Sequence, residues 1–221
     1  MEMITRRGCA LVPLHLSGRV VASFPESRQD ERVSDQFSLF DAPPITDRLF
    51  FAIFPDPATA AGIARQADDL RAAHQLSGRP LAPERFHVTL HHLGDHAGVR
   101  RDIVAMAGEA AETITTPPFE VTFDRAASFH NGGNNPFVLQ GGEGLDALKA
   151  FQRDLGLAMA RAGLGKLVDK SFTPHVTTLY DRRLVAEQVV EPVRWTVGGF
   201  TLIHSLLGRT EHIPLARWTL R

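Results

Sequence analysis

The sequence predicts an α+β protein built as two pseudo-symmetric lobes, each with an antiparallel sheet, that face each other across a central groove. Two observations support this prediction. The phrase His-Val-Thr occurs at residues 87–89 and again, 88 residues later, at 175–177. The expected elements also repeat, because a strand, a helix and a His-Val-Thr strand follow one another in each half of the chain. Duplication of one α+β unit would explain both.

Composition limits the class of protein. With 221 residues, of which 43% are hydrophobic and 22% charged, the chain can form one domain or two small lobes that share a core. A formal net charge of −1 argues against a wide basic surface for long nucleic acid, while recognition of a single nucleotide end stays open. Cys9 is the only cysteine, which excludes an internal disulfide framework and a cysteine-based zinc site. No apolar run approaches the roughly 18 residues that span a membrane. We therefore expect a cytoplasmic protein with no membrane segment.

The first 46 residues differ in composition from the rest of the chain. They are polar, show no sustained periodicity and end near Pro43 and Pro44, so we expect a flexible extension at 1–46 and a folded domain at 47–221. Gln36 and Phe40 bound a short apolar peptide that resembles the segments by which bacterial proteins dock on the sliding clamp. Two other interpretations stay open: an apolar segment that folds back on the body, or a start codon placed upstream of the true protein.

In the first half, residues 49–54 read as a buried strand. Asp56 can cap a helix whose first position is Pro57, and the helix should extend to about His74. The other elements expected in this half are the first His-Val-Thr strand, ending near Gly94 and Asp95, and a helix at 99–114 stopped by Pro117 and Pro118.

In the second half, residues 119–123 and 136–140 should form a hairpin around the loop at 130–135. That loop is rich in glycine, but it joins two strands, whereas phosphate-binding loops usually lead into a helix N-terminus, so we do not expect it to bind phosphate. The remaining expected elements are a helix from Leu145 with Gly163 or Gly165 as its C-cap, the second His-Val-Thr strand, and strands at 194–205 and 215–220.

The two His-Val-Thr phrases are the candidate catalytic residues. Side chains alternate along a strand, so His87 and Thr89 share one face, and His175 and Thr177 share the equivalent face. If the strands meet at one groove, two imidazoles can donate and accept protons on either side of a reacting centre, as phosphoryl transfer requires. A chance repeat is the alternative, but the shared central valine and the strand-like surroundings make coincidence a poor explanation.

Imidazole is a common zinc ligand, so the group His87, His91, His92 and His96 could indicate a metal site. Strand alternation places His87 and His91 on one face and His92 on the other, and no acidic or thiol ligand has an obvious place nearby, so a metal site is not expected. The remaining histidines have no repeated partner and are interpreted as ordinary surface or strand-end residues: His15, His74, His130, His204 and His212.

From Arg48 to Arg221 the chain resembles the 2H phosphoesterase superfamily, in particular the bacterial RNA 2′,3′-cyclic phosphodiesterases, also called 2′-5′ RNA ligases. Besides the paired His-Val-Thr phrases, the resemblance rests on the opening segment 48–56, on residues 85–95 and on the closing stretch 205–218. It implies metal-independent opening of a 2′,3′-cyclic phosphate at an RNA end to a 2′-phosphate, with reversible 2′-5′ ligation and no cofactor.

The resemblance also implies roles for individual residues. His87 would be the general acid and His175 the general base, while the hydroxyls of Thr89 and Thr177 would donate to nonbridging phosphate oxygens. Reversing acid and base would leave the site unchanged.

The chain departs from the family pattern in one respect. Relatives often have an aromatic residue five positions after the first histidine and an arginine five positions after the second, and the two sandwich the terminal base. His92 and Tyr180 stand at these positions here, and both rings can stack on a base. Arg182 or Arg183 could supply the missing charge, or both could be solvated on a turn.

Several functions are compatible with these residues. The expected partners are RNA 3′ ends or small cyclic-phosphate nucleotides, bound by a monomer. Other 2H activities, on a cyclic nucleotide-like metabolite or a 2′-5′ oligonucleotide, would use the same four residues. A noncatalytic RNA-end binding module and a clamp-tethered adaptor are alternatives from a different class of protein.

Overall fold

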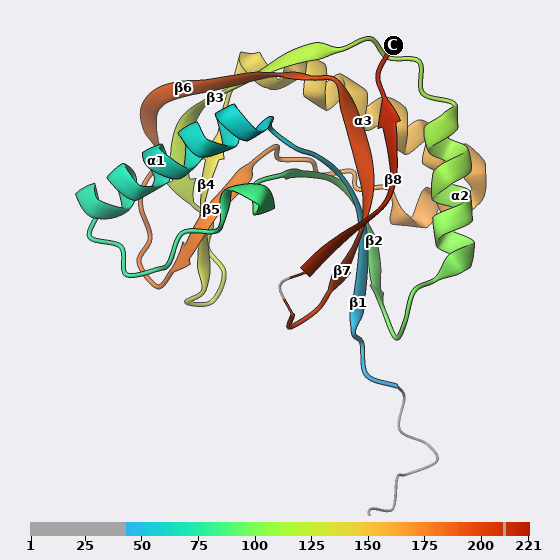
Figure 1. Cartoon of the computed structure of the whole chain (residues 1–221), viewed down its shortest axis with the longest axis horizontal. Helices are drawn as coiled ribbons and strands as arrows, with labels where there is room; N and C mark the ends of the chain where they lie inside the picture. Colours follow the sequence, from blue (N-terminus) through green and yellow to red (C-terminus); the bar gives the residue numbers. More distant parts are fainter. Residues whose placement is uncertain (1–42, 210) are drawn as a thin grey trace, which may run out of the picture. The chain divides into compact units, whose positions relative to one another are not determined.

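Two four-stranded antiparallel sheets form the framework of the computed structural model, which describes residues 43–209 and 211–221 (Figure 1). The strands are β1 (Asp47–Ile53), β2 (Val88–His96), β3 (Phe119–Ser128), β4 (Asn135–Gln140), β5 (Val176–Asp181), β6 (Gln188–Val197), β7 (Gly199–Leu206) and β8 (Glu211–Thr219). The first sheet has the order β2-β1-β7-β8 and the second the order β5-β4-β3-β6. The predicted α+β class with two antiparallel sheets is confirmed.

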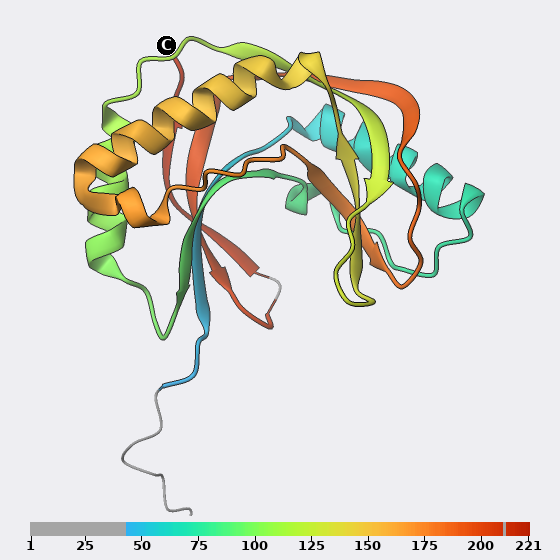
Figure 2. The ribbon, with the colours of Figure 1, turned by 180° about the vertical axis from the view of Figure 1, so that it is seen from behind.

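Helices connect the sheets and cover them. The α-helices are α1 (Pro57–Ala73), α2 (Arg101–Glu112) and α3 (Asp146–Met159). Short helical turns lie at Pro83–Arg85, Glu143–Leu145, Ala160–Leu164 and Gly165–Leu167. Helix α1 packs against β5 and β6, whereas α3 packs against α2, β2 and β3 (Figure 2). Each helix therefore contacts strands from the other half of the sequence. No helix in the described ranges is long and apolar enough to cross a membrane.

The predicted duplication is visible in the connectivity. The unit β1-α1-β2 is repeated as β4-α3-β5, and in both units the two strands pair antiparallel. Both His-Val-Thr strands, β2 and β5, are edge strands of their sheets. Because their outer edges are unpaired within the sheets, these two strands are the ones that can border a common groove.

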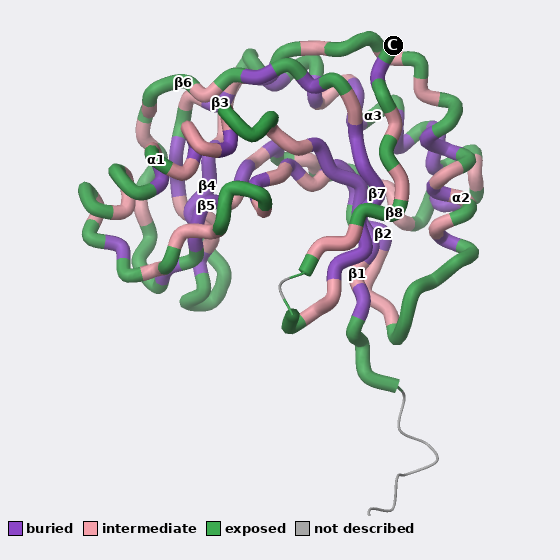
Figure 3. The backbone as a smooth tube through the Cα atoms, viewed as in Figure 1, coloured by how far each residue is buried: buried purple, intermediate pink, exposed green. Residues whose placement is uncertain are grey.

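One hydrophobic core joins the two sheets. A chain of ring contacts leads from Phe51 on β1 to Phe200 on β7 (5.8 Å between ring centroids), then to Phe151 on α3 (5.2 Å) and Phe119 on β3 (5.5 Å). Buried residues of both sheets and all three helices belong to the same cluster (Figure 3). The lobes are therefore held together by apolar burial, which is non-directional and grows with the area removed from water.

The observed ends of the three helices agree with the predicted ends to different extents. Asp56 caps α1 by accepting hydrogen bonds from the backbone N–H groups of Ala58 (2.9 Å) and Thr59 (3.0 Å), and the helix ends at the C-cap His74, as predicted. Helix α2 is shorter than predicted. Helix α3 continues as a π turn at Ala160–Leu164 whose C-cap is Gly165, and Gly163 within this turn has φ of 91°, a left-handed conformation that glycine adopts without steric cost, so both predicted glycines lie at the end of the helix.

The single strand predicted at 194–205 is wrong. β6 ends at Val197 in the second sheet and β7 begins at Gly199 in the first, so the chain changes sheets at Gly198. Gly199 lies so close to β8 that a Cβ atom would be 2.5 Å from the carbonyl oxygen of Trp218. A continuous apolar pattern hid this crossing, because both strands bury side chains and only the two glycines interrupt the pattern.

A β-bulge in β2 changes which side chains face the groove. Thr89 pairs with Ala52, but His91 pairs with Phe51, so Leu90 is the extra residue. His91 is completely buried and His92 is exposed. The predicted alternation, with His91 on the face of His87 and His92 on the opposite face, is therefore wrong beyond Thr89.

Buried polar groups stabilise this bulge. The side-chain amide of Gln152 donates to the carbonyl oxygens of Leu90 (3.4 Å) and Asp169 (3.0 Å). The His91 ring donates from Nε2 to the Gln152 carbonyl (2.9 Å) and accepts at Nδ1 from the Asp169 backbone N–H (3.2 Å), which defines a neutral imidazole. Burial, the main cause, lowers the pKa of His91 and favours this neutral form.

We predict that Gln152→Leu lowers the free energy of unfolding by about 1–3 kcal/mol, because leucine fills similar space but leaves two buried carbonyls without a donor. Urea denaturation followed by circular dichroism measures this change. The control is Gln140→Leu, which should change the stability by less than about 0.5 kcal/mol because the Gln140 amide donates to the exposed side chain of Glu187. Equal stability of the two variants would contradict the role given to Gln152.

Candidate functional site

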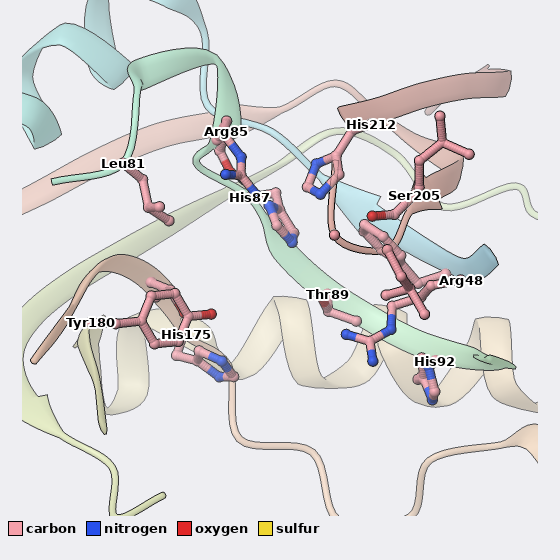
Figure 4. A pocket seen from close by; sticks show the side chains of 15 residues that line it. Arg48, Leu81, Arg85, His87, Thr89, His92, His175, Tyr180, Ser205 and His212 are labelled. Carbon is pink, nitrogen blue, oxygen red and sulfur yellow. Dashed lines mark hydrogen bonds between the residues drawn. The ribbon is translucent and has the colours of Figure 1, made fainter. Parts of the chain in front are cut away.

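A cavity of about 680 Å³ lies where the two His-Val-Thr strands approach each other (Figure 4). Its lining includes both members of each pair, His87 with Thr89 and His175 with Thr177. The other lining residues are Arg48, Phe50, Leu81, Arg85, His92, Tyr180, Ser205, Leu206, Leu207, Gly208 and His212. The structure therefore brings together, in one cavity, the four residues that the repeat singled out.

The two catalytic candidates are held in the same way. His87 Nδ1 lies 2.7 Å from the carbonyl oxygen of Arg85, and His175 Nδ1 lies 2.8 Å from the carbonyl oxygen of Thr173. A carbonyl oxygen only accepts hydrogen bonds, so Nδ1 carries the hydrogen in both rings. Each neutral imidazole then has its lone pair on Nε2, which is the atom left to exchange a proton.

His87 sits in an apolar corner of the cavity. Its ring centroid is 5.3 Å from that of Phe50, 5.8 Å from that of Phe54 and 5.3 Å from that of His212. Burial in this corner lowers the pKa of His87 to about 4 although the hydrogen bond to the Arg85 carbonyl raises it, and electrostatic repulsion from His212, His175 and Arg85 adds to the lowering. His87 is therefore neutral at pH 7 in the empty cavity, and a bound anion would be needed to raise its pKa.

The hydroxyls of Thr89 and Thr177 are available to a ligand. Each threonine lines the cavity two residues after its histidine. Within residues 43–209 and 211–221, neither hydroxyl has a hydrogen-bond partner. The cavity therefore offers two hydroxyl donors beside two imidazoles, a set suited to an anionic, tetrahedral group.

His92 lines the cavity because of the bulge described above. Its Nε2 donates to Asp95 Oδ1 over 2.9 Å, and the same carboxylate accepts two hydrogen bonds of 2.7 Å from the guanidinium group of Arg48. The hydrogen bonds from Arg48, followed by that from His92, hold the pKa of Asp95 well below its usual range. Asp95 thus fixes the orientation of both side chains. Sequence analysis missed Arg48 and Asp95 as site residues, although their pairing on β1 and β2 follows from the strand register.

Tyr180 lines the cavity and is 42% exposed, so its ring is accessible for stacking. Arg182 does not line the cavity, which corrects the expectation that it supplies a cation there. Arg183 instead donates to the carbonyl oxygen of His74 (3.4 Å). The Asp181 carboxylate holds the turn after β5 by accepting the backbone N–H of Arg183 and those of the 77–78 segment. The cavity arginines are Arg48 and Arg85.

Two histidines interpreted as ordinary have specific surroundings. His212, at the start of β8, lines the cavity, and burial lowers its pKa, with Arg85 contributing. His204 is buried and hydrogen-bonded to Asp47. Only the pairing of β8 with β7 places His212 in the cavity, so no local pattern could have identified it. His130 is exposed and outside the cavity, in agreement with the earlier interpretation.

The described part of the chain contains no group of three or more histidine, cysteine or acidic side chains placed to hold a metal ion. His91, one of the histidines considered as a ligand, is buried in its bonds to Gln152 and Asp169, away from the cavity. The glycine-rich loop at 130–135 joins β3 to β4, as predicted, and does not line the cavity.

Known proteins are similar to this chain in sequence and fold. Residues 55–209 match the sequence profile of the 2′-5′ RNA ligase superfamily. The RNA 2′,3′-cyclic phosphodiesterase of Escherichia coli (strain K12) is 32% identical over 183 residues, which cover 78% of this chain and 96% of that protein. A solved structure described as a phosphoesterase is 30% identical, covers 79% of this chain and 98% of its own, and superposes with a TM-score of 0.60. E. coli LigT complexed with 3′-AMP is 29% identical with a TM-score of 0.58, over 79% and 98% of the two chains.

We predict that the low pKa of His87 rises when a phosphate occupies the cavity, because the anion offsets burial and the neighbouring positive charges. Nuclear magnetic resonance of the His87 Cε1–H group, titrated with and without inorganic phosphate, measures both values. The midpoint should lie near 4 without phosphate and move upward with it. The signal of His130, outside the cavity, should not respond to phosphate. A His87 midpoint near 6.5 in the free protein would contradict the description of this corner.

Proposed function

Because the chain belongs to the 2′-5′ RNA ligase superfamily, we propose that it is an RNA 2′,3′-cyclic phosphodiesterase that opens a terminal 2′,3′-cyclic phosphate to a 2′-phosphate. The observation that carries this proposal is the pair of equivalent imidazoles in one cavity, each with Nδ1 bonded to a backbone carbonyl and Nε2 left for proton exchange. The E. coli relative is named for this activity, and LigT structures with 3′-AMP and with phosphate agree with a phosphate-bearing ligand.

In the proposed reaction, water attacks phosphorus and the bond from phosphorus to the 3′ oxygen breaks. His175 Nε2 takes a proton from the water, and His87 Nε2 gives a proton to the departing 3′ oxygen. The products are a 2′-phosphate and a 3′-hydroxyl. Thr89 and Thr177 donate hydrogen bonds to the nonbridging oxygens, where negative charge builds up. The same reaction with the 5′-hydroxyl of another RNA in place of water would give a 2′-5′ phosphodiester and a 3′-hydroxyl, which would account for 2′-5′ ligation, and reversal of that step would regenerate the cyclic phosphate.

The low pKa of His87 places a condition on this order of proton transfers. As the acid, His87 has to be protonated in the substrate complex, although it is neutral at pH 7 in the empty cavity. The negative charge of the cyclic phosphate, in contact with Nε2, supplies the needed increase in pKa. The histidine thus becomes charged only when substrate is bound, and it is unprotonated when the product leaves.

The proposed reaction requires neither a metal ion nor a cofactor, since two imidazoles carry out both proton transfers and two hydroxyls bind the charge. Tyr180 and His92 supply flat rings at the ends of the cavity for the terminal base. A volume of about 680 Å³ is suited to a nucleotide end and falls within the usual range of small-molecule sites. We place the catalytic domain at 47–221 and the protein in the cytoplasm as a monomer.

The first test of this function uses an RNA oligonucleotide ending in a 2′,3′-cyclic phosphate, incubated with the full chain in the presence of EDTA. We expect a 2′-phosphate end, identified by its mobility and its resistance to a 3′-specific phosphatase. His87→Ala and His175→Ala should each lower the rate by at least about a hundredfold, since each removes one general acid or base. His130→Ala, outside the cavity, is the matched control and should keep full activity. Production of a 3′-phosphate would contradict the proposal.

The pH dependence of turnover tests whether His87 and His175 act as an acid and base pair. One imidazole must be charged and the other neutral, so kcat should rise and then fall with pH in a bell shape. Below the optimum the base is protonated, and above it the acid has lost its proton. The pH profile of kcat/KM depends on the pKa values of the free protein, in which the pKa of His87 is lowered. The optimum of kcat/KM should therefore lie at a more acidic pH than the optimum of kcat. A profile that is flat from mildly acidic to mildly alkaline pH would exclude two-histidine catalysis.

A further inference from the structure

Arg85 is the cavity arginine whose charge has no partner in the described part of the protein. It ends the helical turn Pro83–Arg85 just before β2, and its side chain lines the cavity. Its Nε is buried without a hydrogen bond, and its guanidinium group forms no ion pair or hydrogen bond with residues 43–209 or 211–221. Arg48, the other arginine of the cavity, is bound by both oxygens of Asp95.

An unpaired, partly buried guanidinium group is unfavourable in the empty protein. Its N–H groups lose water without gaining acceptors. Its charge also disfavours protonation of both His87 and His212. An anion in front of Arg85 would satisfy the guanidinium and reduce this repulsion, so the empty site is arranged for a negatively charged group.

The position of Arg85 separates it from the reacting phosphate. Arg85 and Thr89 lie on opposite sides of His87, toward opposite ends of the cavity (Figure 4). In the proposed reaction the cyclic phosphate already has three donors, protonated His87 and the two threonine hydroxyls, while His175 accepts from the attacking water. Arg85 instead lies on the side of the His87 ring where Leu81 and Tyr180 line the cavity (Figure 4).

This end of the cavity is rigidly built. The backbone N–H of Leu81 donates to the carbonyl oxygen of Thr178 (2.8 Å), and the Asp181 carboxylate accepts from the backbone N–H groups of Ser77 (2.6 Å) and Gly78 (2.7 Å). A Cβ atom at Gly78 would lie 1.9 Å from the carbonyl oxygen of Tyr180, so this segment lies directly against β5. The backbone segments that carry Leu81 and Tyr180 are thus held against each other, as expected for a preorganised stacking position.

We propose that Arg85 binds the phosphate on the 5′ side of the nucleotide that carries the cyclic phosphate. With the terminal base on Tyr180, that phosphate lies at the Leu81 end and accepts hydrogen bonds from the guanidinium group. The protein therefore prefers polynucleotide or 5′-phosphorylated ends to nucleoside 2′,3′-cyclic phosphates. This inference rests on the proposed function and narrows its substrate class.

The test compares adenosine 2′,3′-cyclic phosphate with the same compound bearing a 5′-phosphate, using the full chain. The readout is the ratio of the two kcat/KM values, so any effect of Arg85 through the pKa of His87 cancels because both substrates share it. Wild type should favour the 5′-phosphorylated substrate, and Arg85→Gln should lower this preference by about ten- to a hundredfold, the usual loss for a charge-assisted hydrogen bond. Arg85→Lys should keep part of it.

Arg101→Gln serves as the matched control, because Arg101 is exposed on α2 and outside the cavity; its preference should equal that of wild type. Thermal unfolding of each variant checks that the fold is retained. An equal loss on both substrates would assign Arg85 to the reacting phosphate and overturn the inference. An unchanged ratio in Arg85→Gln would overturn it as well.

A binding experiment separates this inference from the proposed function. Calorimetry measures the affinity for adenosine 2′,5′-bisphosphate and for adenosine 2′-monophosphate, neither of which has to react. Arg85→Gln should weaken binding of the bisphosphate by about tenfold or more and leave the monophosphate within about twofold. If wild type opened neither cyclic substrate yet showed this difference, the proposed function would fail while the phosphate site remained. If both affinities were unaffected, the site would be rejected.

Discussion

The structure depends on one constraint: two edge strands from different sheets must keep their polar faces directed at the same cavity. The aromatic contacts from Phe51 through Phe200 and Phe151 to Phe119 fasten the sheets to a common core. Because cores are packed as densely as crystals, the spacing between β2 and β5 is set by these side chains and cannot drift. The distance between the imidazoles of His87 and His175 is therefore a consequence of apolar packing elsewhere in the protein.

Electrostatics in the cavity favours an anionic ligand. Histidines and arginines line it, and Asp95 already accepts hydrogen bonds from Arg48 and His92. Burial keeps His87 neutral when the cavity is empty, so this imidazole adds its positive charge to those of the arginines only when phosphate binds. A site arranged in this way avoids the cost of burying several like charges in the free protein, yet offers cationic groups to the bound phosphate.

Much of the fold could be predicted because its signals are local. Asp56 and Pro57 mark the start of α1, and two prolines end the region of α2. The sheet change at Gly198 could not be predicted, since adjacent strands look alike in sequence whichever sheet they join. Local patterns also do not show that α1 packs against β5 and β6 or that α3 packs against β2 and β3, because these contacts join segments that are far apart in sequence.

The sequence alone determined the catalytic candidates: period-two alternation puts His87 with Thr89 and His175 with Thr177, and duplication makes the two pairs equivalent. Alternation failed one step later, where the bulge at Leu90 turned His91 inward and His92 toward the cavity. The strand register places Arg48 and His212 in the lining of the cavity, whereas Arg182, in the turn after β5, is not part of that lining. Tertiary structure decided these positions because a side chain's direction follows from its own backbone, whereas its neighbours across a cavity depend on how distant segments pair and pack.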